Sequence, residues 1–132
     1  MIGYLDTSAA LKLVVSEPET KALSGYLQRE ASTSGLSVVA AWLLHTELHC
    51  AANRRAESVD ATQVRSVLDV VDLIDVERAD LIAAGSSPYR LRSSDAIHLA
   101  VALRVGADAM ITYDEDLQRA ALRSGLEVVA PA

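Results

Sequence analysis

Short apolar runs alternate along this chain with longer segments in which apolar residues recur every three or four positions. The short runs predict strands and the longer segments predict helices. We expect strands at 2–5, 36–40, 71–76, 109–112 and 126–129. We expect helices at 8–15, 17–31, 41–55, 59–71, 77–84, 95–105 and 115–124. Strands that alternate with helices indicate parallel βαβ units, so the pattern predicts an α/β fold.

Local signals place several of the helix ends. The stretch SEPE at 16–19 reads as a capping box, with Ser16 at the cap and Glu19 three residues later. Ser93 or Ser94 could cap the apolar helix that follows, and Gly125 ends the helix before the last strand. No linker, repeat or low-complexity segment interrupts the pattern, and we expect one domain over residues 1–132.

Composition narrows the class of protein. Hydrophobic residues make up 51% of the 132 positions, which argues against disorder. The longest uncharged apolar stretch, LSVVAAWLL, is too short to span a bilayer, and no signal peptide is evident, so we expect no membrane association. A single cysteine, Cys50, fits a reducing cytoplasm. The net charge of −6 argues against a protein that binds nucleic acid through an overall positive charge. It is compatible with a nuclease whose carboxylates hold metal ions.

Two aspartates directly follow predicted strands. Asp6 ends the run YLD, and Asp114 follows the strand in AMITYD. The carboxyl ends of parallel strands meet at one edge of a sheet, so both carboxylates should project there. Each could equally cap the helix that follows it.

Glu47 and Asp95 extend this acidic set. The neighbours of Glu47 on its helix, three and four residues away, are apolar: Leu43, Leu44, Cys50 and Ala51. A carboxylate in such a stripe is costly unless it is paired or binds a cation, although Glu47 could also lie at the margin of the stripe.

Asp95 begins the apolar helix DAIHLAVAL, where the helix dipole also favours an acid. Four acids near strand ends and helix starts form a constellation suited to Mg²⁺ or Mn²⁺, which take oxygen ligands. Such sites catalyse phosphoryl chemistry.

The stretches LDTSA, TEL around Glu47, RSSDAIHLA and ITYDEDL resemble the PIN-domain nucleases, and most closely the VapC-type toxins of bacterial toxin–antitoxin pairs. The resemblance covers essentially the whole chain. It implies a three-layer α/β/α sandwich with a parallel sheet of about five strands. The implied activity is metal-dependent endoribonuclease cleavage by metal-activated water, leaving 5′-phosphate and 3′-hydroxyl ends.

The resemblance also implies site residues and partners. Asp6, Glu47, Asp95 and Asp114 would be the catalytic, metal-binding acids for Mg²⁺ or Mn²⁺, with Asp116, Thr112 and Ser8 as accessory candidates. The implied partners are an RNA substrate, a cognate antitoxin and a second copy of the chain in a homodimer. Ala40 and Ala41 stand where such proteins often have a serine at the end of a strand, which puts any polar contact from there in doubt.

Other polar residues have ordinary interpretations beside functional ones. We expect His98 to be a core histidine satisfied by a backbone group, although it could orient Asp95 or a bound water. The spacing of His45 and His49 is a weak zinc signal. Cationic and aromatic residues near the site could contact RNA or simply lie at the surface or in the core: Lys12, Arg90, Arg92, Trp42 and Tyr89.

Two other functions compete with the nuclease. A haloacid-dehalogenase-like phosphatase would use Asp6 as a covalent nucleophile, but such enzymes usually carry another Asp where this chain has Ser8. A catalytically inactive PIN-type module would bind proteins only, and the loss of acids that would mark it is not seen. The glycine-rich motifs of nucleotide-binding proteins are missing.

Overall fold

Five parallel strands form the sheet of the protein in the computed structural model, which describes all 132 residues. The strands are β1 (Ile2–Leu5), β2 (Ser37–Ala41), β3 (Asp72–Ile74), β4 (Ala109–Ile111) and β5 (Glu127–Val129). Their order across the sheet is β3-β2-β1-β4-β5, and every neighbouring pair is parallel. The predicted α/β class and the five strands are confirmed.

The order of the strands fixes where a site can form. The chain steps outward from β1 to β2 and β3, and then crosses to β4 on the other side of β1. Gly3 of β1 pairs with Val38 of β2 on one side and with Ala109 of β4 on the other. The carboxyl ends of β1 and β4 therefore flank the point at which the strand order reverses, where open α/β sheets bind their ligands.

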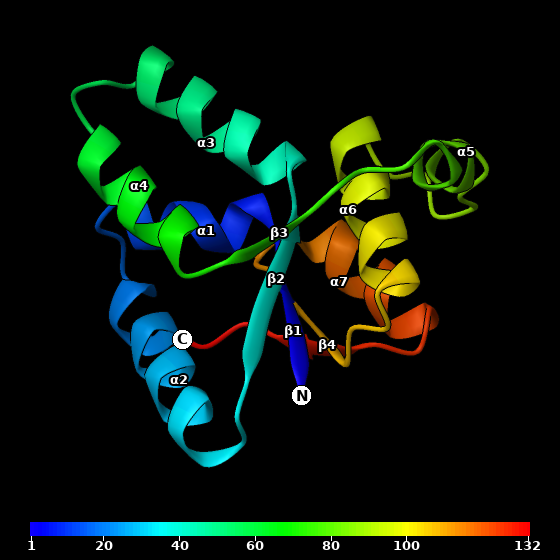
Figure 1. Cartoon of the computed structure of the whole chain (residues 1–132), viewed down its shortest axis with the longest axis horizontal. Coiled ribbons are helices and arrows are strands. Elements are labelled where there is room, and N and C mark those ends of the chain that lie inside the picture. Colours follow the sequence, from blue (N-terminus) through cyan, green and yellow to red (C-terminus); the bar gives the residue numbers. More distant parts are fainter.

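Helices cover both faces of the sheet (Figure 1). One face carries α1 (Thr7–Val14), α2 (Thr20–Thr33), α3 (Leu43–Arg54) and α4 (Ala61–Asp69). The other carries α5 (Arg78–Gly85), α6 (Ser93–Arg104) and α7 (Glu115–Arg123), with α5 packed against α6. The expected three-layer α/β/α sandwich is thus confirmed. None of the helices combines the length and the apolar character that crossing a membrane requires.

The central strands lie in the core, which consists largely of Leu, Val, Ile and Ala. Tyr4, Leu5, Met110 and Ile111 are at most 1% exposed. The edge strands β3 and β5 are only partly buried, and each contains an exposed acidic residue. Asp6 and Asp114 therefore follow two strands that are largely buried in the core.

The predicted capping box at 16–19 is wrong. Helix α2 begins only at Thr20, its cap residue Glu19 makes no side-chain capping bond, and Ser16 is exposed. The acids of the motif turn to Lys12 instead, which forms ion pairs with Glu17 and Glu19. The Thr20 hydroxyl closes the turn by accepting from the Glu17 amide and donating to the Lys12 carbonyl.

Smaller differences concern other ends. The predicted serine cap of the 95–105 helix is wrong, because α6 begins at Ser93 itself, after Arg92, which makes no side-chain capping bond. The predicted strand at 71–76 is shorter as β3, and the predicted helix at 59–71 is shorter as α4. Helix α4 starts where the Asp60 carboxylate accepts from the Thr62 amide.

Candidate active site

Two of the four acids end central strands and cap the helices that follow. The Asp6 carboxylate accepts from the Ala9 amide at 3.1 Å and so caps α1. The Asp114 carboxylate accepts from the Leu117 amide at 2.9 Å and caps α7. Each capping bond uses Oδ1 and leaves Oδ2 for other partners. Capping and convergence at one edge of the sheet therefore occur together and are not alternatives.

Asp6 is the most buried of the four acids, at 2% exposure. Its Oδ1 accepts from the Ser8 hydroxyl at 2.8 Å, and its Oδ2 accepts from the Thr112 hydroxyl at the same distance. Thr112 in turn accepts from the Asp114 amide at 3.1 Å, so it joins the ends of β1 and β4. Burial raises the pKa of Asp6, although the hydrogen bonds from Ala9, Ser8 and Thr112 favour the charged form.

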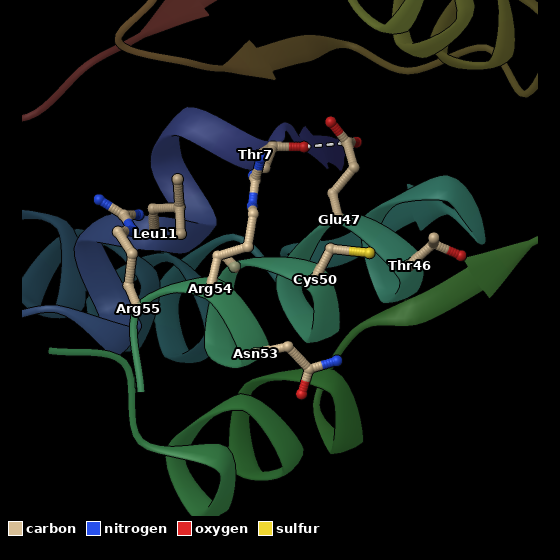
Figure 2. Close-up of a pocket in the computed structure, with 9 residues that line it drawn as sticks. Thr7, Leu11, Thr46, Glu47, Cys50, Asn53, Arg54 and Arg55 are labelled. Carbon is tan, nitrogen blue, oxygen red and sulfur yellow. Dashed lines mark hydrogen bonds between the residues drawn. The ribbon is translucent and has the colours of Figure 1, made fainter. Parts of the chain in front are cut away.

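Glu47 is held by a chain of hydrogen bonds that begins in the core. The Tyr4 hydroxyl accepts from the Ala41 amide at 3.0 Å and lies 2.6 Å from His98 Nδ1. In a neutral imidazole that carries its proton on Nε2, Nδ1 is the acceptor, and the Tyr4 phenol donates to it. His98 Nε2 then donates to Glu47 Oε1 at 2.6 Å. Figure 2 shows the further bond at this oxygen, donated by the Thr7 hydroxyl at 2.7 Å.

These hydrogen bonds change the pKa of Glu47. Burial alone would raise the pKa of its carboxyl, but the bonds from His98 and Thr7 lower it overall. Glu47 is half-buried, at the margin of the apolar stripe rather than within it, and Cys50 beside it is exposed. The expectation that a backbone group would satisfy His98 is wrong, because side chains hold both ring nitrogens.

Asp95 and Asp114 face a common cation. Arg92 Nε lies 3.5 Å from Asp95 Oδ2, and Arg92 Nη2 lies 3.4 Å from Asp114 Oδ2. Burial and the negative charge of Asp114 raise the pKa of Asp95, and Arg92 offsets this only in part. The Arg92 side chain is 82% exposed, so its attraction for the two acids is weakened by solvent.

The structure thus brings the four acids to one edge of the sheet through connected side chains, but not into a single tight cluster. No three His, Cys, Asp or Glu side chains approach closely enough to hold a metal ion. Asp95 and His98 lie one turn apart on α6. Helix α6 thus connects the hydrogen bond between His98 and Glu47 to the ion pairs that Arg92 forms with Asp95 and Asp114. The donor types and the mutual repulsion of Asp95 and Asp114 fit a hard divalent cation.

The accessory candidates differ in their surroundings. Ser8 and Thr112 both donate to Asp6. Asp116 is 72% exposed and pairs with Arg119, one turn away on α7. Lys12, considered as an RNA contact, is engaged by the two glutamates of the SEPE stretch.

Sequence reasoning missed Thr7, Tyr4 and the bridging geometry of Arg92. Thr7 carried a signal, since it directly follows Asp6 at the start of a helix. Tyr4 carried none, because its role depends on partners 37 and 94 residues away in the chain.

A cavity of about 700 Å³ adjoins Glu47 (Figure 2). Thr7 and Leu11 of α1 line one side, and residues of α3 line the other, ending with Arg54 and the adjacent Arg55. The cavity therefore connects a candidate acid to two arginines at the end of α3.

His45 and His49 have no third ligand beside them with which they could form a zinc site. Their rings lie 4.4 Å apart between centroids, and the Trp42 ring lies 5.1 Å from His45. These three residues form a ladder of mutually tilted rings at the start of α3, with Trp42 45% exposed. The ladder is an ordinary surface packing arrangement.

Comparison with known proteins identifies the family of the chain. The sequence model of the PIN domain family matches residues 3–122. Ribonuclease VapC46 of Mycobacterium tuberculosis is 39% identical over 132 residues, covering 98% of this chain and 97% of that protein. Ribonuclease VapC47 of the same species is 33% identical and covers 97% and 96%.

Solved structures agree on the fold. The M. tuberculosis toxin VapC20, described as cleaving the sarcin–ricin loop, superposes with a TM-score of 0.75 at 16% identity, covering 98% of this chain and 99% of that one. The VapBC2 complex of Rickettsia felis, bound to promoter DNA, contains a chain with a TM-score of 0.72 at 16% identity, covering both chains completely. The chain belongs to the PIN domain family, among the relatives of the VapC ribonucleases.

Proposed function

We propose that this protein is a divalent-metal-dependent endoribonuclease that acts as the toxin of a toxin–antitoxin pair. The observation that carries the proposal is the convergence of Asp6, Glu47, Asp95 and Asp114 at the point where the strand order reverses, in a chain related to VapC ribonucleases. The four acids would hold Mg²⁺ or Mn²⁺. When bound, such an ion supplies charge neutralisation for the phosphodiester and lowers the pKa of water.

The residues of the chain would prepare this site in different ways. Ser8 and Thr112 hold both oxygens of Asp6, so its carboxylate keeps one orientation without a ligand. His98 and Thr7 do the same for Glu47 Oε1 and leave Oε2 free of protein hydrogen bonds. Arg92 offsets the negative charge of Asp95 and Asp114 in part, and a divalent cation held by these two acids would neutralise it further.

The phosphatase alternative loses its support. Enzymes of that type usually carry a second aspartate two residues after the nucleophile. This chain has Ser8 there, and its hydroxyl donates to Asp6. The match over residues 3–122 assigns the chain to the PIN domain family and not to the phosphatases.

Digestion of total cellular RNA tests the proposal. We expect the purified protein to release new RNA 5′ ends in Mg²⁺ or Mn²⁺ and to stop in excess chelator, with the ends mapped by sequencing. Asp6→Asn and Asp95→Asn should lower cleavage at least about a hundredfold, since each removes a charge from the proposed ligand set while keeping its shape. Asn also retains helix capping, so Asp6→Asn should still fold.

Asp69→Asn is the matched control. It removes the same charge from an exposed aspartate at the end of α4, outside the proposed ligand set, and we expect it to cleave like the wild type. Full activity in chelator would reject the metal mechanism. Equal activity of Asp6→Asn, Asp95→Asn and Asp69→Asn would reject the proposed ligand set.

The remaining assignments complete the proposal. We propose that residues 1–132 form one PIN domain, that the protein works in the cytoplasm, and that it forms a homodimer. A cognate antitoxin with a basic tail would reach the acidic edge. The VapBC2 complex of R. felis and a toxin–antitoxin complex from Klebsiella pneumoniae, both similar in fold, support such a partner.

A further inference from the structure

We infer that the cavity between α1 and α3 is a subsite for the RNA backbone, in which Arg54 and Arg55 bind phosphate groups next to the one that is cleaved. This inference rests on the proposed function, because it names how the same site takes its substrate. We call the cavity the arginine groove, lined by Thr7, Leu11, Thr46, Glu47, Cys50, Ala51, Asn53, Arg54 and Arg55.

The arginine groove begins at a candidate metal ligand. Glu47 and Thr7, joined by a hydrogen bond, lie at one end (Figure 2). Arg54 lies seven residues after Glu47 on α3, on the same side of the helix and about 10 Å further along its axis. A strand whose scissile phosphate lies at the acids can therefore continue along α3 toward Arg54.

The two arginines are available for a ligand. Both are exposed, and neither forms an ion pair within the chain. By contrast, Lys12, Arg92, Arg104 and Arg119 are all paired with carboxylates. Arginines without an acidic partner, beside a cluster of acids that would repel RNA, supply the local positive charge that a chain of net charge −6 lacks.

The groove wall suits RNA in other respects as well. Asn53 and Thr46 supply hydrogen-bonding groups, and Leu11 with Ala51 supplies an apolar floor for a base or sugar. A basic antitoxin tail fits the acidic edge of the sheet, but it would meet like charge at Arg54 and Arg55. Charge complementarity thus favours RNA over that tail in the groove.

RNA binding without cleavage tests the inference. The probe is a fluorescein-labelled single-stranded RNA 20-mer of mixed sequence, titrated with protein in chelator at several salt concentrations and followed by anisotropy. We expect Arg54→Ala to weaken binding about tenfold at low salt. The slope of log K against log salt should fall by about 0.7 for each lost phosphate contact, and by about 1.4 in Arg54→Ala/Arg55→Ala.

Arg29→Ala is the matched control, since Arg29 is an exposed, unpaired arginine on α2, away from the groove lining. It should bind like the wild type, and Arg54→Lys should restore part of the affinity by restoring the charge. Equal binding by Arg54→Ala and Arg29→Ala, or no measurable binding by the wild type at low salt, would overturn the inference. If Arg54→Ala/Arg55→Ala lost antitoxin binding but kept RNA binding, the inference would also be overturned, because the groove would then bind a protein.

The same variants separate this inference from the proposed function. If the wild type cleaves RNA in a metal-dependent way but Arg54→Ala binds RNA as the wild type does, the subsite is rejected and the proposed nuclease function is retained. Binding that depends on Arg54, without cleavage in Mg²⁺ or Mn²⁺, supports the subsite and rejects the nuclease.

Discussion

The phenol of Tyr4 is a single group on which both the core and the site depend. It accepts a hydrogen bond from the Ala41 amide, it contacts His98 Nδ1, and it is fully buried. Burial raises the pKa of Tyr4 far above its ordinary range, so the phenol stays protonated and can donate. By donating to Nδ1, the phenol favours the tautomer of His98 that carries its proton on Nε2, the nitrogen that faces Glu47.

We predict that Tyr4→Phe lowers the free energy of unfolding by about 1–3 kcal/mol, measured by urea denaturation. The substitution keeps the ring but leaves the Ala41 amide and His98 Nδ1 without a partner in the core. Tyr26→Phe is the control, because Tyr26 is partly exposed and should change stability by less than about 0.5 kcal/mol. Similar stability for the two variants would show that the Tyr4 hydroxyl bonds contribute little.

Residues close in sequence to the strand ends could be predicted, and residues joined across the fold could not. The positions of Asp6 and Asp114 could be predicted because each residue lies between the end of a strand and the start of a helix. For Arg92 the sequence indicates only a positive charge that could contact RNA, since its contact with Asp114 joins positions 22 residues apart. The arginine groove needed the packing of α1 against α3, which no local pattern states.

At the scale of elements, one ion pair fastens α5 to the rest of the molecule. Asp80 of α5 is 2% exposed, and its two oxygens accept from Arg104 of α6 at 2.9 and 3.0 Å. Arg104 also donates to the Asp75 carbonyl in the segment before α5. The pair thus joins α5, α6 and the end of β3.

We predict that Asp80→Asn lowers the free energy of unfolding by about 1–3 kcal/mol at pH 7. Arg104 lowers the pKa of Asp80 in the folded chain, so the charged pair stabilises above the unfolded pKa of about 3.9. That contribution is lost as the pH falls through the lower folded value. The gap between wild type and Asp80→Asn should therefore close in urea titrations below about pH 3.

Glu77→Gln is the control for this pair. Glu77 lies 3.5 Å from Arg104 but is 57% exposed, so its loss should cost less than about 0.5 kcal/mol. A gap for Asp80→Asn that stays as large below pH 3 as it is at pH 7 would contradict the ionic explanation.

Element boundaries show why capping motifs alone are weak predictors. The SEPE stretch has the letters of a capping box, yet Lys12 from the preceding helix attracts both glutamates. A reciprocal bond does occur at the start of α5, where Asp80 accepts from the Glu77 amide at 2.8 Å. Ion pairs between elements thus decided an outcome that local sequence left open.

The architecture of the whole molecule was predictable because apolar runs and helical periods alternate without interruption. Parallel strands buried on both faces require continuous apolar runs, and β1, β2 and β4 have them. The arrangement of the acids relative to one another was less predictable. Their side chains are held by hydroxyls, an imidazole and a guanidinium, and not by a shared cation.

Helices α5 and α6 expose large apolar side chains. Leu81 and Ile82 of α5 are 52% and 63% exposed, and Leu103 of α6 is 45% exposed. Large apolar side chains exposed on two helices that pack against each other favour an interaction surface there. Since most soluble oligomers are symmetric homodimers, we expect two copies of the chain to pair through these helices.

We predict that light scattering at tens of micromolar gives the wild type a mass twice the 14.1 kDa of one chain. Ile82→Glu should give the mass of one chain, because a charge at the centre of the proposed interface would be buried without a partner. Val70→Glu introduces the same charge at a side chain that is 76% exposed, beyond the end of α4, and should remain dimeric. A monomeric wild type would reject the dimer, and dimeric Ile82→Glu would place the interface on another face.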